Sequence, residues 1–242
     1  MLEIPLVLCY NGAKRKGERK MKAKPMILVL AVSLFCCGIM TVVDGVWMPG
    51  YVVKSAVKLA LFLVLPFLCS LWDPAISYKS LFRANKKGVL AALGLGAGLY
   101  ALIVGGYFLL KDVFDFSNIA SSLTESTGID GDNFLFVALY ISFANSLLEE
   151  FFFRGFVFTN LKSSSNRFFA YLFSSLLFSL YHTAMMIGWF SLPLFLLVLV
   201  GLAAGGAIFN YLNEKYNTVF VSWIVHMFAN FAINAVGFIL LK

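Results

Sequence analysis

The chain has 242 residues, of which 61% are hydrophobic and 13% charged, and its formal net charge is +7. Soluble domains carry about 25% charged and about 45–50% apolar residues, so a soluble protein of this length would have too little polar surface to cover its apolar residues. The composition excludes a soluble enzyme, a disordered tail protein and a secreted disulfide scaffold. It predicts an all-α polytopic membrane bundle.

The positive charge is concentrated before the first apolar stretch. Seven of the 19 basic residues lie there: Lys14, Arg15, Lys16, Arg19, Lys20, Lys22 and Lys24. A basic cluster beside a membrane span anchors to anionic lipid and sets orientation, so we expect membrane lipid and no nucleic acid as a partner. The four cysteines have no CxxC or metal-ligand spacing and are interpreted as small apolar residues.

Seven apolar stretches are long enough to be helical spans, against alternatives of six or eight. They are residues 26–43, 52–72, 88–110, 133–160, 168–187, 190–212 and 218–241. An eighth short element fits within 111–132. Lys54 and Lys58 begin the second span and are expected to snorkel to the membrane surface. The pairs Gly94/Gly98 and Gly201/Gly205 predict close helix contacts.

The loop charges predict the orientation of the chain. The amino-terminal tail, the loop 73–87 and the loop after the fourth span are basic, whereas 111–132 is acidic. The positive-inside rule then places the amino terminus in the cytoplasm. We expect a basic cytoplasmic tail over 1–25, amino-terminal transmembrane helices over 26–132 and a catalytic membrane core over 133–242. Brevity and small loops favour a prokaryotic plasma membrane.

Five ionisable residues fall inside the last four spans. They are Glu149, Glu150 and Arg154 in the fourth span, His182 in the fifth and His226 in the seventh, and these histidines are the only two in the chain. A charge at mid-bilayer costs about 2.5–3.5 kcal/mol on insertion scales, so such residues are functional candidates.

The depth of these residues in the membrane provides a second argument. Counted from the cytoplasmic helix ends at about 1.5 Å per residue, Glu149 lies roughly 16 Å deep and His182 roughly 21 Å. By the same count His226 lies roughly 12 Å deep and Asn230, one turn further on, roughly 18 Å. All four are therefore expected in one slab near the bilayer centre.

Helix geometry separates the roles of the two glutamates. Adjacent helical residues point about 100° apart, so Glu149 and Glu150 cannot both face one cavity. Arg154 follows Glu150 by four residues, the favourable acid-before-base spacing, so these two are expected to neutralise each other. Glu149 then remains as the free carboxylate.

A free carboxylate, a histidine and two neutral donors are the components of water-mediated amide hydrolysis. Glu149 would take a proton from water, and His182 would hold and polarise that water. His226 and Asn230 share a helix face and would stabilise the oxyanion. Phe178, one turn before His182, is expected to pack against the imidazole or to line the cavity.

Three sequence motifs occur in these spans, in order. Glu149-Glu150-Phe-Phe-Phe-Arg154 resembles the EExxxR motif of the CPBP intramembrane proteases, the family of type II CAAX prenyl proteases and bacteriocin-processing enzymes. Phe178-Ser-Leu-Tyr-His182 resembles the family's FxxxH motif, and His226-Met-Phe-Ala-Asn230 its HxxxN motif. The resemblance covers residues 133–236.

The resemblance implies a glutamate-type endopeptidase without a metal or other cofactor, with a helical core around a cavity open to the cytoplasm and the membrane. Glu149 would be the catalytic carboxylate, His182 the water-positioning histidine, and His226 with Asn230 the oxyanion hole. Glu150 and Arg154 would support the site. The implied partner is a protein or peptide substrate, a class that includes prenylated carboxyl-terminal peptides, bacteriocin leaders and signalling peptides.

Two alternatives stay open at this point. Glu149, His182 and His226 are also a ligand set of hydrolytic zinc sites, although no HExxH motif is present. Buried Glu–Arg and His–Asn pairs also tie helices together, so a transporter, a membrane scaffold or an immunity protein without catalytic activity would carry similar residues.

Overall fold

The structure is a computed structural model that describes residues 22–78, 81–83, 85–116, 118 and 134–240. These residues are helical with short connections, and no strand occurs among them. Seven of their helices are long and apolar enough to cross a membrane. The predicted all-α bundle with seven spans is confirmed, and the protein is an integral membrane protein. Most of the predicted tail and of the segment 111–132 lies outside the described residues.

The amino-terminal half of the described chain forms three spans. The first consists of α1 (Ala23–Val42) and the π-helical η1 (Val43–Trp47). The second consists of α2 (Tyr51–Leu59), the π-helical η2 (Ala60–Val64) and α3 (Leu65–Trp72). The third is α4 (Lys86–Leu110), in which the Asn85 side chain caps the first turn by accepting from Gly88 N at 2.9 Å.

The carboxyl-terminal half forms four spans. The fourth is continuous through α6 (Phe134–Tyr140), η3 (Ile141–Asn145), α7 (Ser146–Glu150), η4 (Phe151–Phe158) and α8 (Thr159–Ser164). The fifth is α9 (Arg167–Tyr181) followed by the 3₁₀ turn η5 (Ala184–Met186). The sixth is α10 (Leu192–Tyr216) and the seventh is α11 (Val219–Leu240).

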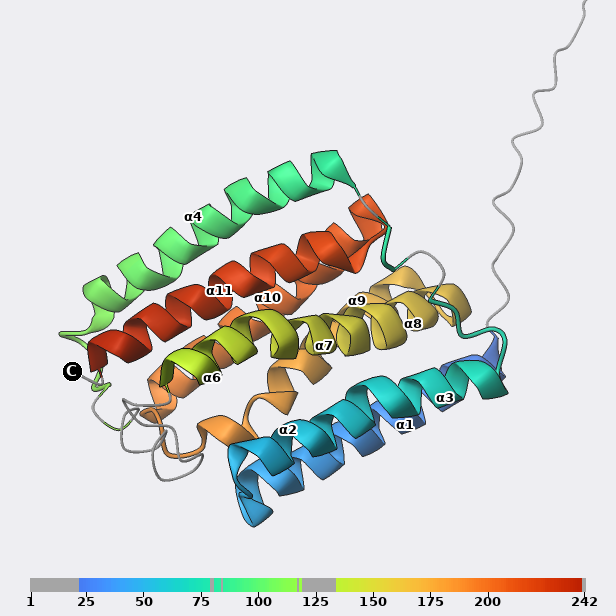
Figure 1. Cartoon of the computed structure of the whole chain (residues 1–242), viewed down its shortest axis with the longest axis horizontal. Coiled ribbons are helices and arrows are strands. Elements are labelled where there is room, and N and C mark those ends of the chain that lie inside the picture. Colours follow the sequence, from blue (N-terminus) through green and yellow to red (C-terminus); the bar gives the residue numbers. More distant parts are fainter. Residues whose placement is uncertain (1–21, 79–80, 84, 117, 119–133, 241–242) are drawn as a thin grey trace, which may run out of the picture.

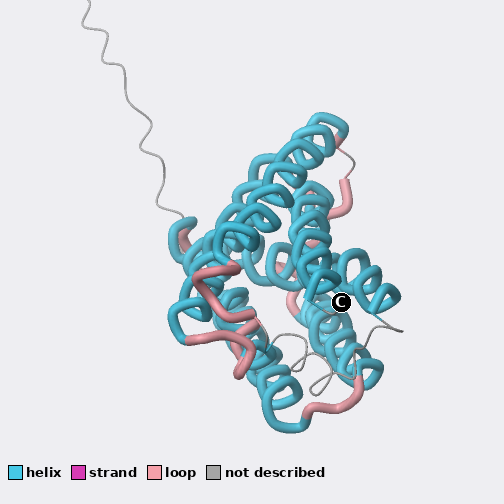
Figure 2. Tube along the Cα trace, turned by 90° about the vertical axis from the view of Figure 1, so that its left-hand side faces the viewer, coloured by secondary structure: helices cyan, strands magenta, loops and turns pink. Residues whose placement is uncertain are grey.

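The fourth span lies in the middle of the bundle. Figure 1 shows α4 and α11 side by side on one side of it, with α10 behind α11, and the hairpin of α1 with α2 and α3 on the other side. Figure 2 shows the bundle turned by 90°, with its helices joined by loops. The central helix therefore presents side chains to both halves of the chain at once.

Two π-helical segments, η3 and η4, flank α7 on this central span. The sequence predicted only one over-long helix and gave no indication of π turns. A π turn widens the helix by one residue and rotates the side chains that follow it, and such turns are frequent at functional sites. In this span the five-residue α7, which carries both glutamates, lies between them.

Stacked aromatic rings attach the amino-terminal hairpin to the central span. Phe62 of η2 stacks on Phe152 at 4.0 Å between ring centroids, and Phe152 meets Phe153 edge-on at 5.0 Å. Phe153 in turn contacts Phe178 of α9 edge-on at 5.2 Å. Each aromatic pair contributes about 0.5–1.5 kcal/mol beyond area burial, so this row of rings fixes the second span against the fourth and fifth.

The predicted glycine contacts are wrong in their positions. A Cβ added to Gly94, Gly98, Gly201 or Gly205 would meet nothing within 4 Å. The close approach is made instead by Gly96, where a Cβ would lie 2.5 Å from Phe228 of α11. Gly94 and Gly98 each lie two residues from Gly96, about 200° around the helix, and so point away from α11.

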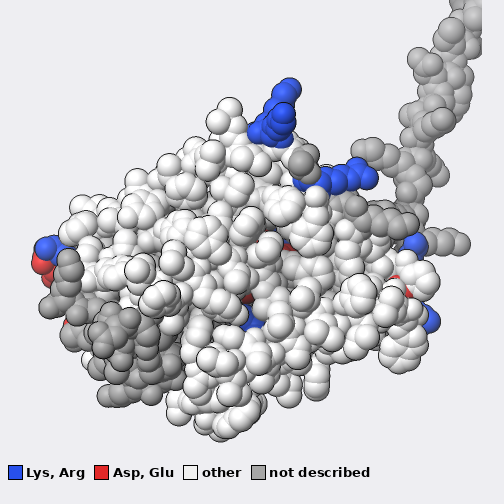
Figure 3. All heavy atoms as spheres, in the orientation of Figure 1, with Lys and Arg blue, Asp and Glu red and all other residues white. Residues whose placement is uncertain are grey.

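Basic residues gather at one end of the bundle, where α4 begins and α8 ends (Figure 3). Backbone bonds hold that end together: Lys22 N donates to Ser164 O at 2.9 Å, and Val219 N donates to Leu81 O at 2.9 Å. The first, third, fifth and seventh spans therefore begin at the same end, as the loop charges predicted.

In the loop between the second and third spans, burial raises the pKa of Tyr78, whose hydroxyl donates to Pro66 O at 2.7 Å.

Candidate active site

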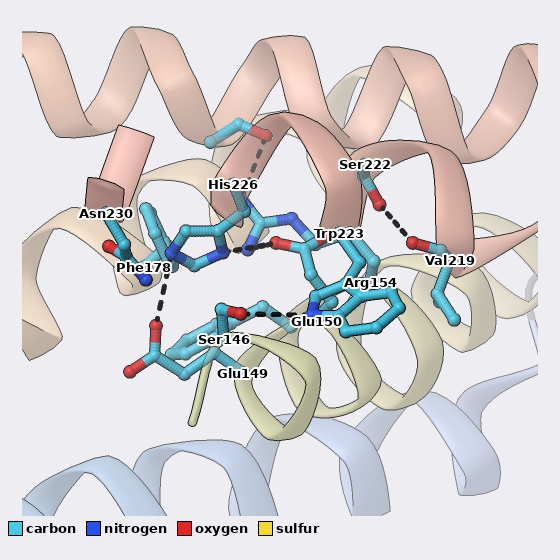
Figure 4. Close-up of polar contacts among 12 residues, drawn as sticks. Ser146, Glu149, Glu150, Arg154, Phe178, Val219, Ser222, Trp223, His226 and Asn230 are labelled. Carbon is cyan, nitrogen blue, oxygen red and sulfur yellow. Dashed lines mark hydrogen bonds and ion pairs between the residues drawn. The ribbon is translucent and has the colours of Figure 1, made fainter. Parts of the chain in front are cut away.

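The candidate site is built around α7, where Glu149 and Glu150 are 3% and 0% exposed. His182 forms the carboxyl-terminal cap of α9, and His226 lies within α11. Figure 4 shows His226 between the two carboxylates, with Glu149 on one side and Glu150 on the other. The structure thus brings together residues from three spans.

Glu149 faces both histidines through one of its oxygens. Glu149 Oε2 lies 3.8 Å from His182 Nε2 and 3.7 Å from His226 Nε2. These distances exceed the usual range of about 2.7–3.2 Å for a direct hydrogen bond, and such polar gaps are commonly bridged by water. The three atoms therefore converge on a position suited to a small polar molecule.

The opposite nitrogen of each ring is already bonded. His182 Nδ1 lies 2.7 Å from Phe178 O, and His226 Nδ1 lies 3.0 Å from Glu150 Oε1. A carbonyl and a carboxylate can only accept, so both Nδ1 atoms carry the proton that is donated. In its neutral form each histidine then presents the lone pair of Nε2 toward Glu149.

Two predictions about this region are wrong. Lys58 does not snorkel, and Glu149 is not a free carboxylate, because Lys58 Nζ lies 2.5 Å from Glu149 Oε1. Lys54 is likewise buried and lies 2.9 Å from Asp44 Oδ1. The α2 face that carries both lysines packs against the core, where an ammonium group needs a counter-charge.

The sequence contained a signal for both of these ion pairs. Lys54 and Lys58 lie four residues apart, on one face of a helix, and Asp44 closes the preceding apolar stretch. Three charges in otherwise apolar spans need partners, whereas the prediction moved the two lysines to the membrane surface.

The predicted pairing of Glu150 with Arg154 is confirmed. Arg154 Nη1 lies 3.1 Å from Glu150 Oε1, and both side chains are fully buried. The guanidinium also lies over the ring of Phe178, at 4.3 Å from its centroid, and donates to Gly206 O at 3.4 Å. Glu150 Oε1 is therefore shared between Arg154 and His226, which fixes the orientation of the imidazole.

Phe178 packs against both histidines, and packing against the imidazole was one of the two arrangements that the sequence predicted for it. Its ring meets that of His182 edge-on at 4.7 Å and that of His226 edge-on at 5.7 Å. Phe178 is buried, with 2% of its surface exposed, and its ring contacts both imidazoles and the Arg154 guanidinium. It thereby supports three site residues with one ring.

Asn230 lies one turn beyond His226, and Figure 4 places its amide on the side of His226 that faces Glu149. Its Nδ2 donates to Ile141 O in η3 at 3.2 Å. An amide nitrogen carries two N–H groups, and this bond uses one of them. The η3 carbonyl therefore orients the asparagine toward the space between α7 and α11.

Within the part of the chain that the structure describes, no group of three or more His, Cys, Asp or Glu side chains is arranged to hold a metal ion.

Comparison with known proteins gives a family match over part of the chain. Residues 131–232 match the family described as type II CAAX prenyl endopeptidase, Rce1-like. No match was found among curated proteins or among solved structures. The matched segment runs from the start of α6 into α11 and contains all seven site residues predicted from the sequence, whereas Lys58 lies outside it. Over residues 131–232, less than half of its length, the chain is therefore similar to the Rce1-like type II CAAX prenyl endopeptidase family, in agreement with its CPBP-like motifs.

Proposed function

We propose that the protein is an intramembrane endopeptidase that hydrolyses a peptide bond with water activated by Glu149, without a metal ion. The family match implies a peptidase of the CAAX type. The observation that carries the mechanism is the convergence of Glu149 Oε2 with Nε2 of His182 and of His226 at 3.8 and 3.7 Å.

In the first step Glu149 Oε2 accepts a proton from a water molecule, and the water oxygen attacks the scissile carbonyl carbon. His182 Nε2 accepts a hydrogen bond from the same water, because its Nδ1 proton is already donated to Phe178 O. The carbon–oxygen π bond opens, and the negative charge collects on the former carbonyl oxygen.

Asn230 and His226 stabilise that oxygen. The asparagine offers an N–H, and His226 donates from Nε2 once the proton taken from the water has passed to it from Glu149, while its Nδ1–H bonds to Glu150. Removing one such donor in other hydrolases costs about 2.7–4 kcal/mol of transition-state stabilisation. In the second step this proton passes back through Glu149 to the amide nitrogen, the carbon–nitrogen bond breaks, and a carboxylic acid and an amine leave.

The substrate is a protein or peptide that reaches the site from lipid or from the basic side of the membrane, and the class includes lipidated carboxyl-terminal segments. We assign the basic end of the bundle, and with it the amino terminus, to the cytoplasm of a prokaryotic cell. The positive-inside rule supports this orientation, since the basic loops meet at one end.

The test compares peptide termini in cells that express the wild type, Glu149→Gln or Glu214→Gln at equal membrane abundance. Glu214 is the matched control, because it lies in the last turns of α10 and pairs with Lys162 and with the exposed Arg167 rather than with a predicted site residue. New termini with the wild type and with Glu214→Gln, absent with Glu149→Gln, are expected. Identical termini in all three would instead support a non-catalytic scaffold or immunity protein.

A further inference from the structure

Lys58 is the basic group nearest to Glu149, and it comes from α2, outside the segment matched by the family. Its ammonium donates to Glu149 Oε1 at 2.5 Å and to Asn145 Oδ1 at 2.6 Å. It also lies over the ring of Tyr181, at 5.1 Å from the centroid. The carboxylate of Glu149, the amide of Asn145 and the ring of Tyr181 together hold the Lys58 ammonium in one position.

Asn145 completes this arrangement from the central span itself. It lies one turn before Glu149, and its Nδ2 donates to Glu149 Oε1 at 3.1 Å. Both donors, Lys58 and Asn145, therefore bind the same carboxylate oxygen. The other oxygen, Oε2, is the one directed at the two histidines.

The formal charges of the buried cluster balance only when Lys58 is included. Glu149 and Glu150 contribute two negative charges, and Arg154 contributes one positive charge. All are essentially buried, and an unbalanced buried charge is strongly unfavourable. Lys58 supplies the missing positive charge while both histidines are neutral, so the ionised carboxylate that general-base chemistry needs is present in the resting site.

We infer that Lys58 is a positioning residue of the active site, which binds one oxygen of Glu149 and thereby directs the other at the water between the histidines. The inference rests on the proposed function. The second span is then part of the active site, and the segment 133–242 does not contain the complete machinery. The row of rings from Phe62 to Phe153 holds that span in place.

The ion pair is tested first by thermal unfolding of the purified full chain in detergent. The variants are Lys58→Met, Glu149→Gln and the double variant, and each single change leaves one buried charge unpaired. We expect both single variants to unfold at lower temperature than the wild type, and the double variant to unfold above the less stable single one. Additive losses in the double variant would overturn the pairing of Lys58 with Glu149.

The role in positioning is tested by cleavage per folded molecule, counted from the wild-type-dependent termini. Lys54→Met is the matched control, because Lys54 lies one turn earlier on the same face, is 8% exposed against 6% for Lys58, and pairs with Asp44 instead. Misplacing a reacting group costs about a hundredfold in rate, so Lys58→Met should lose cleavage to this extent while Lys54→Met retains it. Equal cleavage by the two variants would overturn the inference.

A chemical rescue separates positioning from a merely structural role. Lys58→Ala leaves a space that propylammonium fills, and this cation should restore cleavage whereas propanol should not. Failure of the cation, with Lys58→Ala folded, would contradict the inference. If the wild type and Glu149→Gln produced the same termini, the proposed function itself would fail, and the unfolding experiment would still decide whether Lys58 and Glu149 are coupled.

Discussion

Glu150 accepts a hydrogen bond from His226 through the same oxygen, Oε1, that binds Arg154, at 3.0 and 3.1 Å respectively. One buried carboxylate thus connects a structural ion pair on the central span with a histidine on the seventh. The adjacent carboxylate, Glu149, points about 100° away around α7 and meets Lys58 and the open nitrogens of both histidines. The two glutamates therefore differ in function because of their direction.

Arg154→Met is expected to destabilise the protein by about 3–5 kcal/mol, because it leaves the Glu150 charge buried without its main partner. The measurement is the free energy of unfolding in mixed detergent micelles. The control is Arg167→Met, which removes a pair with Glu214 whose arginine side chain is 65% exposed. Such a pair is worth about 0–1 kcal/mol, so a similar loss in both variants would contradict the central role of Arg154.

Asn230→Ala is expected to lower the rate of cleavage by about 100- to 1,000-fold without lowering stability to the same degree, because it removes one donor for the oxyanion. The measurement is the rate of appearance of wild-type-dependent termini at equal folded abundance. Asn234→Ala is the control: Asn234 lies one turn further along α11 and donates to Ala138 O at 3.2 Å. Full activity of Asn230→Ala would remove Asn230 from the oxyanion hole.

Gly96→Ala is expected to cost about 1–3 kcal/mol of stability, since the new methyl group would lie 2.5 Å from Phe228 and force it to move. Gly94→Ala, two residues away, meets nothing within 4 Å and should gain up to about 1 kcal/mol from better helix propensity. Thermal unfolding of the pair measures the contact between α4 and α11. Equal effects of the two changes would show that α4 does not pack on α11 through Gly96.

Chelation is expected to leave cleavage unchanged, because Glu149 activates the water directly in the proposed mechanism. The measurement is cleavage by the purified protein after dialysis against a strong chelator, followed by assay with and without added Zn²⁺. Loss of activity that Zn²⁺ restores would support the alternative in which Glu149, His182 and His226 bind a metal ion. Added Zn²⁺ should not restore cleavage to Glu150→Gln under either mechanism, since the Glu150 carboxylate binds His226 and not the water.

The sequence by itself determined that the chain lies in a bilayer, the number of its spans and most members of the candidate site. Long apolar runs need a bilayer, and a backbone in lipid has to be helical, so seven spans follow from hydropathy. The costs of intramembrane charges singled out Glu149, Glu150, Arg154 and the two histidines, because such charges persist only with a function or a partner. The spacing of four residues was sufficient to pair Glu150 with Arg154, since both lie on one helix.

Only the tertiary structure decided which groups from different spans meet. The partner of Glu149 is Lys58, 91 positions earlier in the chain, and no helical periodicity relates two residues across that separation. The same holds for Gly96 against Phe228, because the face that a helix turns to its neighbour depends on the packing of both. The π turns on either side of α7 rotate the side chains that follow them, and the sequence pattern does not indicate them because hydropathy measures apolar length and not helical pitch.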